Sequence, residues 1–447
     1  MHDPETAAPM HPAPAPVWAL PFGVMLWAVA VLPAAVPRLW HRRMGTIVGL
    51  GVSALLVPLA LVHGPAAAAT LAGRALLGRY LPFVSVLFAL YAIAGGVRVA
   101  GGPWGRPAGN TLLLGLGTLL AGLVGSTAAA MLLIEPLLSA NAHRRHRRHL
   151  VIAAIILVGN AGGALSPIGN PPLMVGYLAG VPFFWPVRHL ALPLLLFSAP
   201  FLAGFWLLDR RHARADPAPP LRRPLRVRGA GNLALLALVA CAVPLQALVP
   251  LGQLRLGGVT APLGGLLAAA FSLAAGLVSL RLTPRAIHRR NRFSLAPMRE
   301  VAVLFLGLFV TIAPVLAMLR AGAAGPFAPL LALAAGPGGA GVPALYFLFY
   351  GMLSAVLDNA PAWLVFFGLA GGDAPALLAH DPRLLAAISA GAVFWGGLTY
   401  LGNAPNLMLR AIAAHRGVRM PGFFAYSGLA AASLLPLLAL LGLVFFR

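Results

Sequence analysis

The chain has 447 residues, of which 60% are hydrophobic and 9% are charged. Soluble domains carry about 25% charged residues, and apolar runs long enough to cross a hydrocarbon core of ~30 Å recur along this chain. The formal charge of +23 would suit a nucleic-acid-binding protein, but the basic residues are all arginine and cluster in short loops beside apolar runs, as the positive-inside rule describes. We therefore expect an all-α, polytopic membrane protein that binds no nucleic acid.

The N-terminal third predicts a short tail followed by three crossings. Residues 1–16 lack the basic region of a signal peptide, and the first apolar run, 17–37, precedes a basic group at 38–43. The positive-inside rule places this group in the cytoplasm and the tail outside. Runs at 44–63 and 81–96 are expected to cross next, with an interfacial helix at 70–80 between them.

The stretch 111–138 is predicted to be a re-entrant hairpin. Arginines flank it on both sides, at Arg98 and Arg106 before it and in the sequence HRRHRRH at 143–149 after it. A single crossing would place one of these groups outside. A turn at Gly125-Ser126-Thr127 returns the chain instead, and arms of about 13 residues, or about 20 Å, carry the tip past the midplane.

Glycines and prolines predict a discontinuous helix at 150–180, because proline lacks the amide hydrogen that a continuous helix needs. A crossing at 190–208 follows and completes a first repeat, 17–208. The basic, proline-rich segment 209–231 is predicted to be a cytoplasmic linker to a second repeat, 232–447.

The second repeat is predicted to contain the same kinds of element. Its ordinary crossings are expected at 232–250, 261–280, 301–319 and 423–446, its hairpin at 342–370 with Asp358 and Asn359 at the tip, and its broken helix at 384–414. The prediction for the whole chain is ten crossings and two hairpins, with both termini outside.

The two repeats resemble each other in sequence. GGALSPIGNPP, from Gly162, aligns with GGLTYLGNAP, from Gly396, with one gap, and Ser126-Thr127 at the first tip corresponds to Asp358-Asn359 at the second. The predicted copies run in opposite directions through the membrane. Interrupted segments at matching positions of an inverted repeat indicate a midplane binding site in secondary transporters.

Three motifs, SPIGNPPLMVGYLAGVPFFW, DNAPAWLVFFGLAGG and GNAPNLMLRAIAAHRGVRMPGFF, resemble the ion-transporter superfamily, most of all its sodium/proton antiporters. The superfamily also includes citrate or dicarboxylate carriers and arsenite permeases. The resemblance implies that the hairpins and broken helices meet at the membrane centre, often in a homodimer whose transport domain slides against a scaffold. It also implies cation sites at the matching positions, which are Ser126, Thr127, Ser166, Gly169, Asn170, Asp358, Asn359, Thr399, Gly402 and Asn403.

These residue types suit a sodium site. Unwound carbonyls at Gly169 and Gly402 and side-chain oxygens nearby can coordinate the ion, and Asp358 would neutralise its charge. Since one carboxylate can hold either a sodium ion or a proton, but not both, Asp358 is sufficient for antiport without a cofactor. The alternatives are that Asp358 caps a helix, that the asparagines form turns, and that the hydroxyls bond carbonyls within a helix.

Glu135 and the histidines at 143–149 have separate interpretations. Glu135 is a candidate proton relay, or it pairs with Arg144 or Arg145 near the membrane surface. His143, His146 and His149 alternate with arginines that would repel a metal ion, so we expect a solvated basic face.

Rival functions can be weighed from the same residues. An organic-anion carrier, for citrate or a dicarboxylate, needs helix N-termini or an arginine near the midplane; the breaks supply the former, but no arginine falls inside a hairpin or a break. Sequence motifs of membrane-embedded enzymes are absent. The prediction is a sodium/proton antiporter of the bacterial cytoplasmic membrane, with arsenite efflux and organic-anion transport as alternatives.

Overall fold

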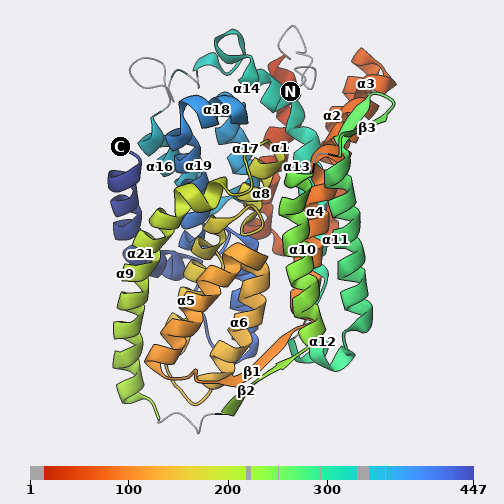
Figure 1. The fold of residues 1–447 in the computed structure, drawn as a ribbon. Coiled ribbons are helices and arrows are strands. Elements are labelled where there is room, and N and C mark those ends of the chain that lie inside the picture. Colours follow the sequence, from red (N-terminus) through yellow and green to blue (C-terminus); the bar gives the residue numbers. More distant parts are fainter. Residues whose placement is uncertain are drawn as a thin grey trace.

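The computed structural model is mostly helical and describes residues 15–217, 223–249, 251–291, 293–329, 332, 342–357 and 359–447. Most helices run along one axis of the molecule, and α1 begins at the same end at which α21 finishes (Figure 1). Asp358 lies outside the described residues, as does most of the tail at 1–16.

The first half contains continuous helices and two interrupted helical regions. Its helices are η2 (Pro16–Ala19), α1 (Leu20–Ala35), α2 (Pro37–His63), α3 (Pro65–Ala75), η3 (Leu76–Tyr80), α4 (Leu81–Gly95), α5 (Pro107–Val124), α6 (Ser126–Ala140), α7 (Arg148–Ala153), η4 (Ala154–Val158), η5 (Ala161–Leu165), α8 (Pro171–Leu178) and α9 (Trp185–Ala215). Several begin with proline, which suits the first helical position because its missing amide hydrogen would have no partner there.

The second half contains α10 (Ala230–Leu248), α11 (Leu263–Leu282), α12 (Arg285–Asn291), α13 (Ala296–Thr311), α14 (Ala313–Arg320), η6 (Gly322–Ala324), α16 (Pro343–Val356), α17 (Asn359–Leu369), α18 (Ala374–His380), α19 (Pro382–Phe394), η7 (Gly396–Leu398), α20 (Ala404–His415) and α21 (Phe423–Phe445). Two aspartates between the second hairpin and the second broken helix cap helices: Asp373 accepts the Ala376 N–H and Asp381 the Leu384 N–H.

Two predictions of element boundaries need correction. The predicted interfacial helix at 70–80 does not stand alone, because α3, the π-helical turn η3 and α4 form one helix, Pro65–Gly95. Helix α9 continues to Ala215, so the predicted linker is helical at its start and Asp209 is fully buried. The cause in the second case is a buried ion pair that no local sequence pattern indicates.

Two small antiparallel ribbons accompany the helices. Strand β1 (Arg98–Gly102) pairs with β2 (Arg223–Arg228), with Arg98 opposite Arg228, and joins distant parts of the chain at one end of the molecule (Figure 1). Strands β3 (Gln253–Leu256) and β4 (Val259–Pro262) form a hairpin between α10 and α11.

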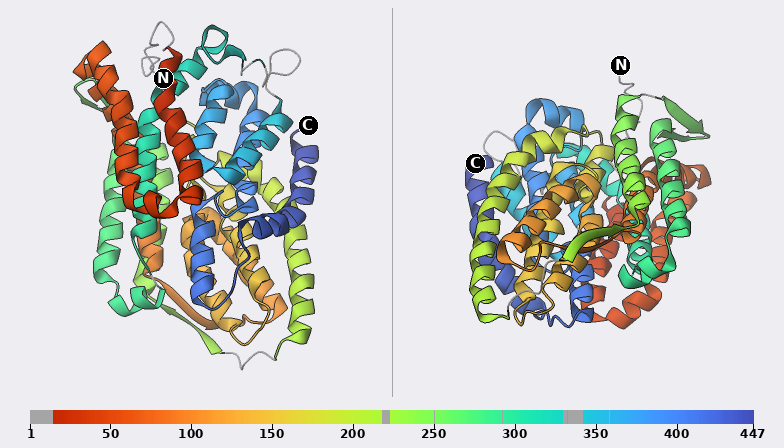
Figure 2. Two further views of the ribbon diagram at one scale, coloured as in Figure 1. Left: turned by 180° about the vertical axis from the view of Figure 1, so that it is seen from behind. Right: turned by 60° about the horizontal axis from the view of Figure 1, so that its bottom comes forward.

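The helices gather into two groups. Helix α4 packs against α10 and α11, and α2 against α13, on the right of Figure 1. The interrupted elements pack with one another: α5 against α6 and η5, α16 against α19, and α17 against α8. The reverse view shows the same two groups side by side (Figure 2), so the interrupted segments of both halves share one region of the protein.

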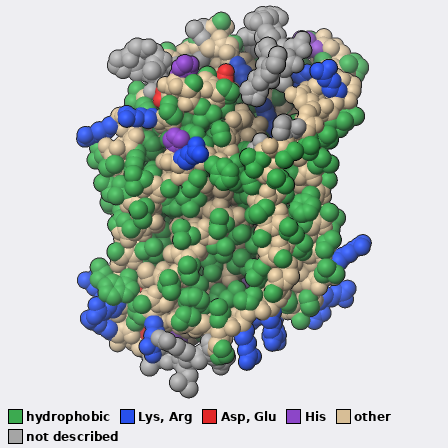
Figure 3. All heavy atoms as spheres, in the orientation of Figure 1, with side chains coloured by type: hydrophobic (Ala, Val, Ile, Leu, Met, Phe, Trp, Pro, Cys, Tyr) green, Lys and Arg blue, Asp and Glu red, His purple; other side chains and the backbone are tan. Residues whose placement is uncertain are grey.

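The exterior identifies the chain as a multi-pass membrane protein. Among the described residues, seven helices are long and apolar enough to cross a membrane, or up to nine if each of two bent pairs is one span; ten crossings were predicted. On the face shown in Figure 3, apolar side chains cover the middle and arginines lie toward the two ends. Leu61 is 83% and Phe424 86% exposed, which suits contact with lipid.

Candidate functional site

The first hairpin turns at Gly125, between α5 and α6. Gly125 has φ +92°, a left-handed conformation that favours glycine. The Ser126 N–H, at the start of α6, donates to the Gly169 carbonyl over 2.9 Å. A Cβ on Gly125 would lie 3.2 Å from the Ile168 carbonyl oxygen, so the tip sits directly against the first broken helix.

The first broken helix is interrupted between η5 and α8. The Ser166 hydroxyl donates to the Gly122 carbonyl of the hairpin, and the Gly169 N–H donates back to the Ser166 carbonyl and hydroxyl oxygens. A Cβ on Gly169 would lie 2.3 Å from the Gly163 oxygen. The backbone therefore doubles back on itself here with no space for a side chain.

The second broken helix repeats this geometry. The Thr399 hydroxyl donates to the Ala355 carbonyl of the second hairpin, and in both halves the acceptor lies 44 residues before the donor. A Cβ on Gly402 would lie 2.5 Å from the Gly396 oxygen. The Asn406 amide holds the break closed by donating to the Gly396 and Thr399 carbonyls.

These matches correct the alignment drawn from sequence. Thr399 follows Ser166 by the same number of residues as Gly402 follows Gly169 and Asn403 follows Asn170. The two repeats therefore align here without a gap. The same spacing pairs Ser126 with Asn359, because these residues begin α6 and α17. By numbering alone, Asp358 then aligns with Gly125, one position from the predicted equivalence.

Asparagine side chains join the two broken helices. The Asn403 amide donates to the Gly159 carbonyl at 3.0 Å and to the Asn160 side-chain oxygen at 3.3 Å. The Asn160 amide donates in turn to the Asn406 side-chain oxygen at 2.8 Å. All three side chains are buried, so these bonds tie one half of the chain to the other in its interior.

The second hairpin tip reaches the first broken helix through Asn359. Its amide nitrogen donates to the Asn170 side-chain oxygen at 3.2 Å and to the Ala392 carbonyl at 3.3 Å, and its backbone carbonyl accepts the Tyr350 hydroxyl. Asn359 Oδ1 and Asn170 Nδ2 are buried without a hydrogen-bond partner within the described part of the chain. A buried polar atom without a partner costs about 1–3 kcal/mol, so a cation or a donor beside the oxygen, and an acceptor beside the nitrogen, would be stabilising.

A cavity of about 60 Å³ lies beside the first hairpin tip. Ser126, Thr127, Gly169 and Asn403 line it together with apolar side chains such as Leu90 and Phe305. The structure thus brings these four predicted residues to one space, with Asn170 next to Gly169. Ser166, Thr399 and Gly402 instead form the hydrogen bonds and close approaches that shape the breaks.

Glu135 lies away from this cavity, at the other end of α6. It pairs with Arg416, and not with Arg144 or Arg145 as predicted. Arg144 is committed elsewhere: its guanidinium contacts Asp209 at 2.6 Å and Asp216 at 3.2 Å. The expected solvated histidine face is also wrong in part, because His149 bonds Asp209 at 2.8 Å and is largely buried.

Asn160 and Asn406 are structural partners that were not predicted. Both are fully buried, and each is an asparagine inside an otherwise apolar run. That pattern is the signal that could have found them, because a buried amide must meet a partner. It would not have identified the partner, which in this case lies 246 residues away.

Comparison with known proteins identifies the family of this chain. A search of curated proteins finds no similar sequence. A family model described as "Putative citrate transport" matches residues 13–446, nearly the whole chain. Together with the apolar helices, this match indicates a transporter and not an enzyme. The chain belongs to this "Putative citrate transport" family of multi-pass membrane transporters.

Proposed function

We propose that this protein is a sodium/proton antiporter that exchanges Na⁺ or Li⁺ for H⁺ at a site around Asp358, Asn359 and Asn170. In this proposal the two halves form an inverted repeat, each with a re-entrant hairpin and a broken helix. The matching hydrogen bonds of Ser166 and Thr399 support the repeat. As in the antiporters that the sequence resembles, we expect the protein to work as a homodimer in a bacterial cytoplasmic membrane.

The unpartnered oxygen of Asn359 is the observation that carries the proposal. It is buried where the start of the second hairpin's returning helix meets the break of the first broken helix. A cation would supply the interaction that this oxygen lacks. Asp358, the preceding residue in the sequence, would supply the negative charge, and unwound carbonyls near Gly169 would supply further oxygen ligands, as in other transporters with broken helices.

The size and lining of the neighbouring cavity also favour a small cation. A volume of about 60 Å³ is far below the ~300–1,000 Å³ of organic-ligand pockets. The residues that line it include neither arginine nor histidine. Burying a tricarboxylate there without a basic partner would be costly.

The proposed exchange follows from competition for one carboxylate. A cation bound at Asp358 excludes the proton, and a proton bound there removes the charge that attracts the cation. Serine, threonine and asparagine oxygens around the breaks orient the ion but do not titrate. Alternating exposure of this site to the two sides of the membrane would then couple the two fluxes.

A carboxylate carrier, for citrate or a similar anion, is the second candidate. The family description favours it, and so do two helix starts, because Ser126 of α6 and Ala404 of α20 line the cavity and helix N-termini attract anions. This candidate requires the cavity to enlarge when it opens. Cation coupling at Asp358 is compatible with it, whereas sodium/proton exchange without any anion is not.

Proton flux in everted membrane vesicles tests the proposal. The vesicles are acidified, and the pH gradient is followed after addition of sodium, lithium or potassium chloride, or of citrate as its choline salt. We expect sodium and lithium to dissipate the gradient, with no response in vesicles containing Asp358→Asn. Asp373→Asn, the same change at a helix cap outside the site, is the matched control and should respond normally. A response to citrate alone would favour the carrier, and full activity of Asp358→Asn would remove the proposed mechanism.

A further inference from the structure

A second, larger cavity lies between α9, α21 and the start of α7, and extends from the level of α21 toward the end of the molecule where the β1–β2 ribbon lies. Its volume is about 840 Å³. One wall is apolar and includes Phe201, Phe205 and Leu437, and the other carries Arg145, Arg148 and three histidines. Helices α9 and α21 pack against each other on the outside of the molecule (Figures 1 and 2), so the cavity borders the lipid-facing surface.

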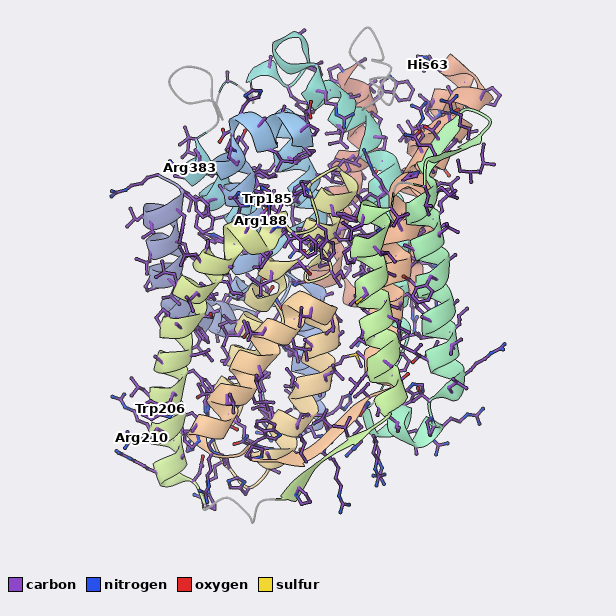
Figure 4. The ribbon with its side chains drawn as sticks, in the orientation of Figure 1. His63, Trp185, Arg188, Trp206, Arg210 and Arg383 are labelled. Carbon is purple, nitrogen blue, oxygen red and sulfur yellow. The ribbon has the colours of Figure 1, made fainter. Side chains whose placement is uncertain are left out.

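The level of this cavity coincides with a boundary between lipid and water. On α9, the Arg210 guanidinium lies over the Trp206 ring at 5.3 Å from its centre, and both side chains lie toward the outer edge of the helix near this end (Figure 4). Tryptophan and arginine concentrate at membrane interfaces, where an aromatic ring meets the headgroups. The apolar wall therefore faces the acyl region and the arginines face the headgroup region.

The negative charges near the cavity are already neutralised. Asp209 and Asp216 are buried. Arg144 contacts both of them, and His149 and His146 contact one each. Neither aspartate therefore forms an ion pair with the neighbouring arginines of the loop, Arg145 and Arg148.

Arg145 and Arg148 carry positive charges that no acidic side chain neutralises in the described part of the chain. Both are exposed, and neither guanidinium has an acidic partner in the part of the chain that the structure describes. Arg147, between them, also lines the cavity and donates to the Arg416 carbonyl, a neutral partner that does not compensate its charge. Uncompensated positive charges at the mouth of an apolar groove complement an amphipathic anion.

We propose that this groove is a binding site for an anionic phospholipid, whose phosphate is held by Arg145 and Arg148 and whose acyl chain lies along Phe201, Phe205 and Leu437. Basic pockets between transmembrane helices are known to bind such headgroups. The occupant would also contact Ile152 and Ala153, which belong to the first broken helix. The lipid would thereby stabilise the element that shapes the transport site.

Thermal unfolding of the purified, delipidated full-length protein tests this site. Phosphatidylglycerol or cardiolipin should raise Tm, whereas phosphatidylcholine and inorganic phosphate should not. In the double variant Arg145→Gln/Arg148→Gln, the lipid concentration needed for half of the shift should rise about thirtyfold, because each arginine near an anionic lipid contributes ~1 kcal/mol and 1.4 kcal/mol is tenfold. Arg289→Gln, an exposed arginine of α12 at the same end, is the matched control.

A second variant separates a lipid from a free anion. Gly204 of α9 lines the groove, and a Cβ there meets nothing within 4 Å, so Gly204→Leu should fill the acyl channel without lowering Tm in lipid-free detergent. We expect it to abolish the lipid-induced shift while both arginines remain. Equal shifts from phosphatidylcholine or from inorganic phosphate, or unchanged lipid response in both variants, would overturn the proposal.

Discussion

Two glycines show how individual residues determine the shape of the candidate site. Backbone carbonyl oxygens close the space at Gly169 and Gly402, because they lie 2.3 Å and 2.5 Å from where a Cβ would be. Alanine at either position must push the backbone of the break apart, and overpacking typically costs ~1–3 kcal/mol. Gly169→Ala and Gly402→Ala should each lower Tm in detergent, whereas Gly204→Ala, with open space around it, should not. An unchanged Tm in the first two would show that the breaks are looser than these contacts indicate.

The contacts of the Asp216 carboxylate, at the end of α9, give a second prediction for single residues. Burial raises the pKa of the Asp216 carboxyl, but the Arg145 N–H, His146 and Arg144 outweigh burial and hold the pKa below its ordinary value. A depressed pKa contributes stability above the unfolded-state pKa and loses it as pH falls through the folded-state pKa.

Asp216→Asn should therefore lower Tm by the same amount at about pH 7 and about pH 5, and the loss should shrink only below about pH 4. The measurement is made in a background with His143→Gln, His146→Gln and His212→Gln, because these three side chains interact with Asp216 and would add a pH dependence of their own. A loss that already disappears at about pH 5 would contradict the assigned contacts.

At the scale of elements, buried asparagines hold the two broken helices together. The Asn160–Asn406 bond joins the first broken helix to α20 at 2.8 Å. A double-mutant cycle of Asn160→Ala and Asn406→Ala should give a coupling of about 0.5–1.5 kcal/mol in the free energy of unfolding, since a net hydrogen bond has that value. Pairing Asn160→Ala with Asn232→Ala, in α10, should give additive effects. Additivity in both cycles would show that the broken helices are not coupled there.

Elements whose ends are set by local sequence signals could be predicted, whereas features that depend on contacts between distant residues could not. Helix α5 ends next to Gly125, and α8 and α20 begin at the Asn–Pro and Asn–Ala–Pro sequences after Gly169 and Gly402, because glycine and proline act on the backbone where they stand. The Arg416 partner of Glu135 is 281 residues away, and no pattern within either segment indicates it. The continuation of α9 beyond Asp209 likewise depends on Arg144, which the sequence placed in a separate loop.

At the scale of the whole molecule, the distribution of arginine predicts its orientation. The end that carries the β1–β2 ribbon and α12 contains Arg98 and Arg228 of the ribbon and the arginines of α12, so from the positive-inside rule we expect it to lie in the cytoplasm. A single cysteine at Arg289 should be protected from an impermeant maleimide in intact cells, and one at Arg383, at the opposite end (Figure 4), should be labelled. Both are introduced with Cys241→Ser, which removes the lone native cysteine. Labelling at position 289 and protection at position 383 would contradict the proposed orientation in the membrane.

The central claim, that a cation and a proton compete for one buried site, is tested most directly with purified protein in proteoliposomes. An outward proton gradient should drive uptake of radioactive sodium without any organic anion, and unlabelled sodium or lithium should compete. We expect Asp358→Asn to abolish this uptake and Asp373→Asn to retain it. Sodium uptake that requires citrate, or that persists in Asp358→Asn, would contradict the claim.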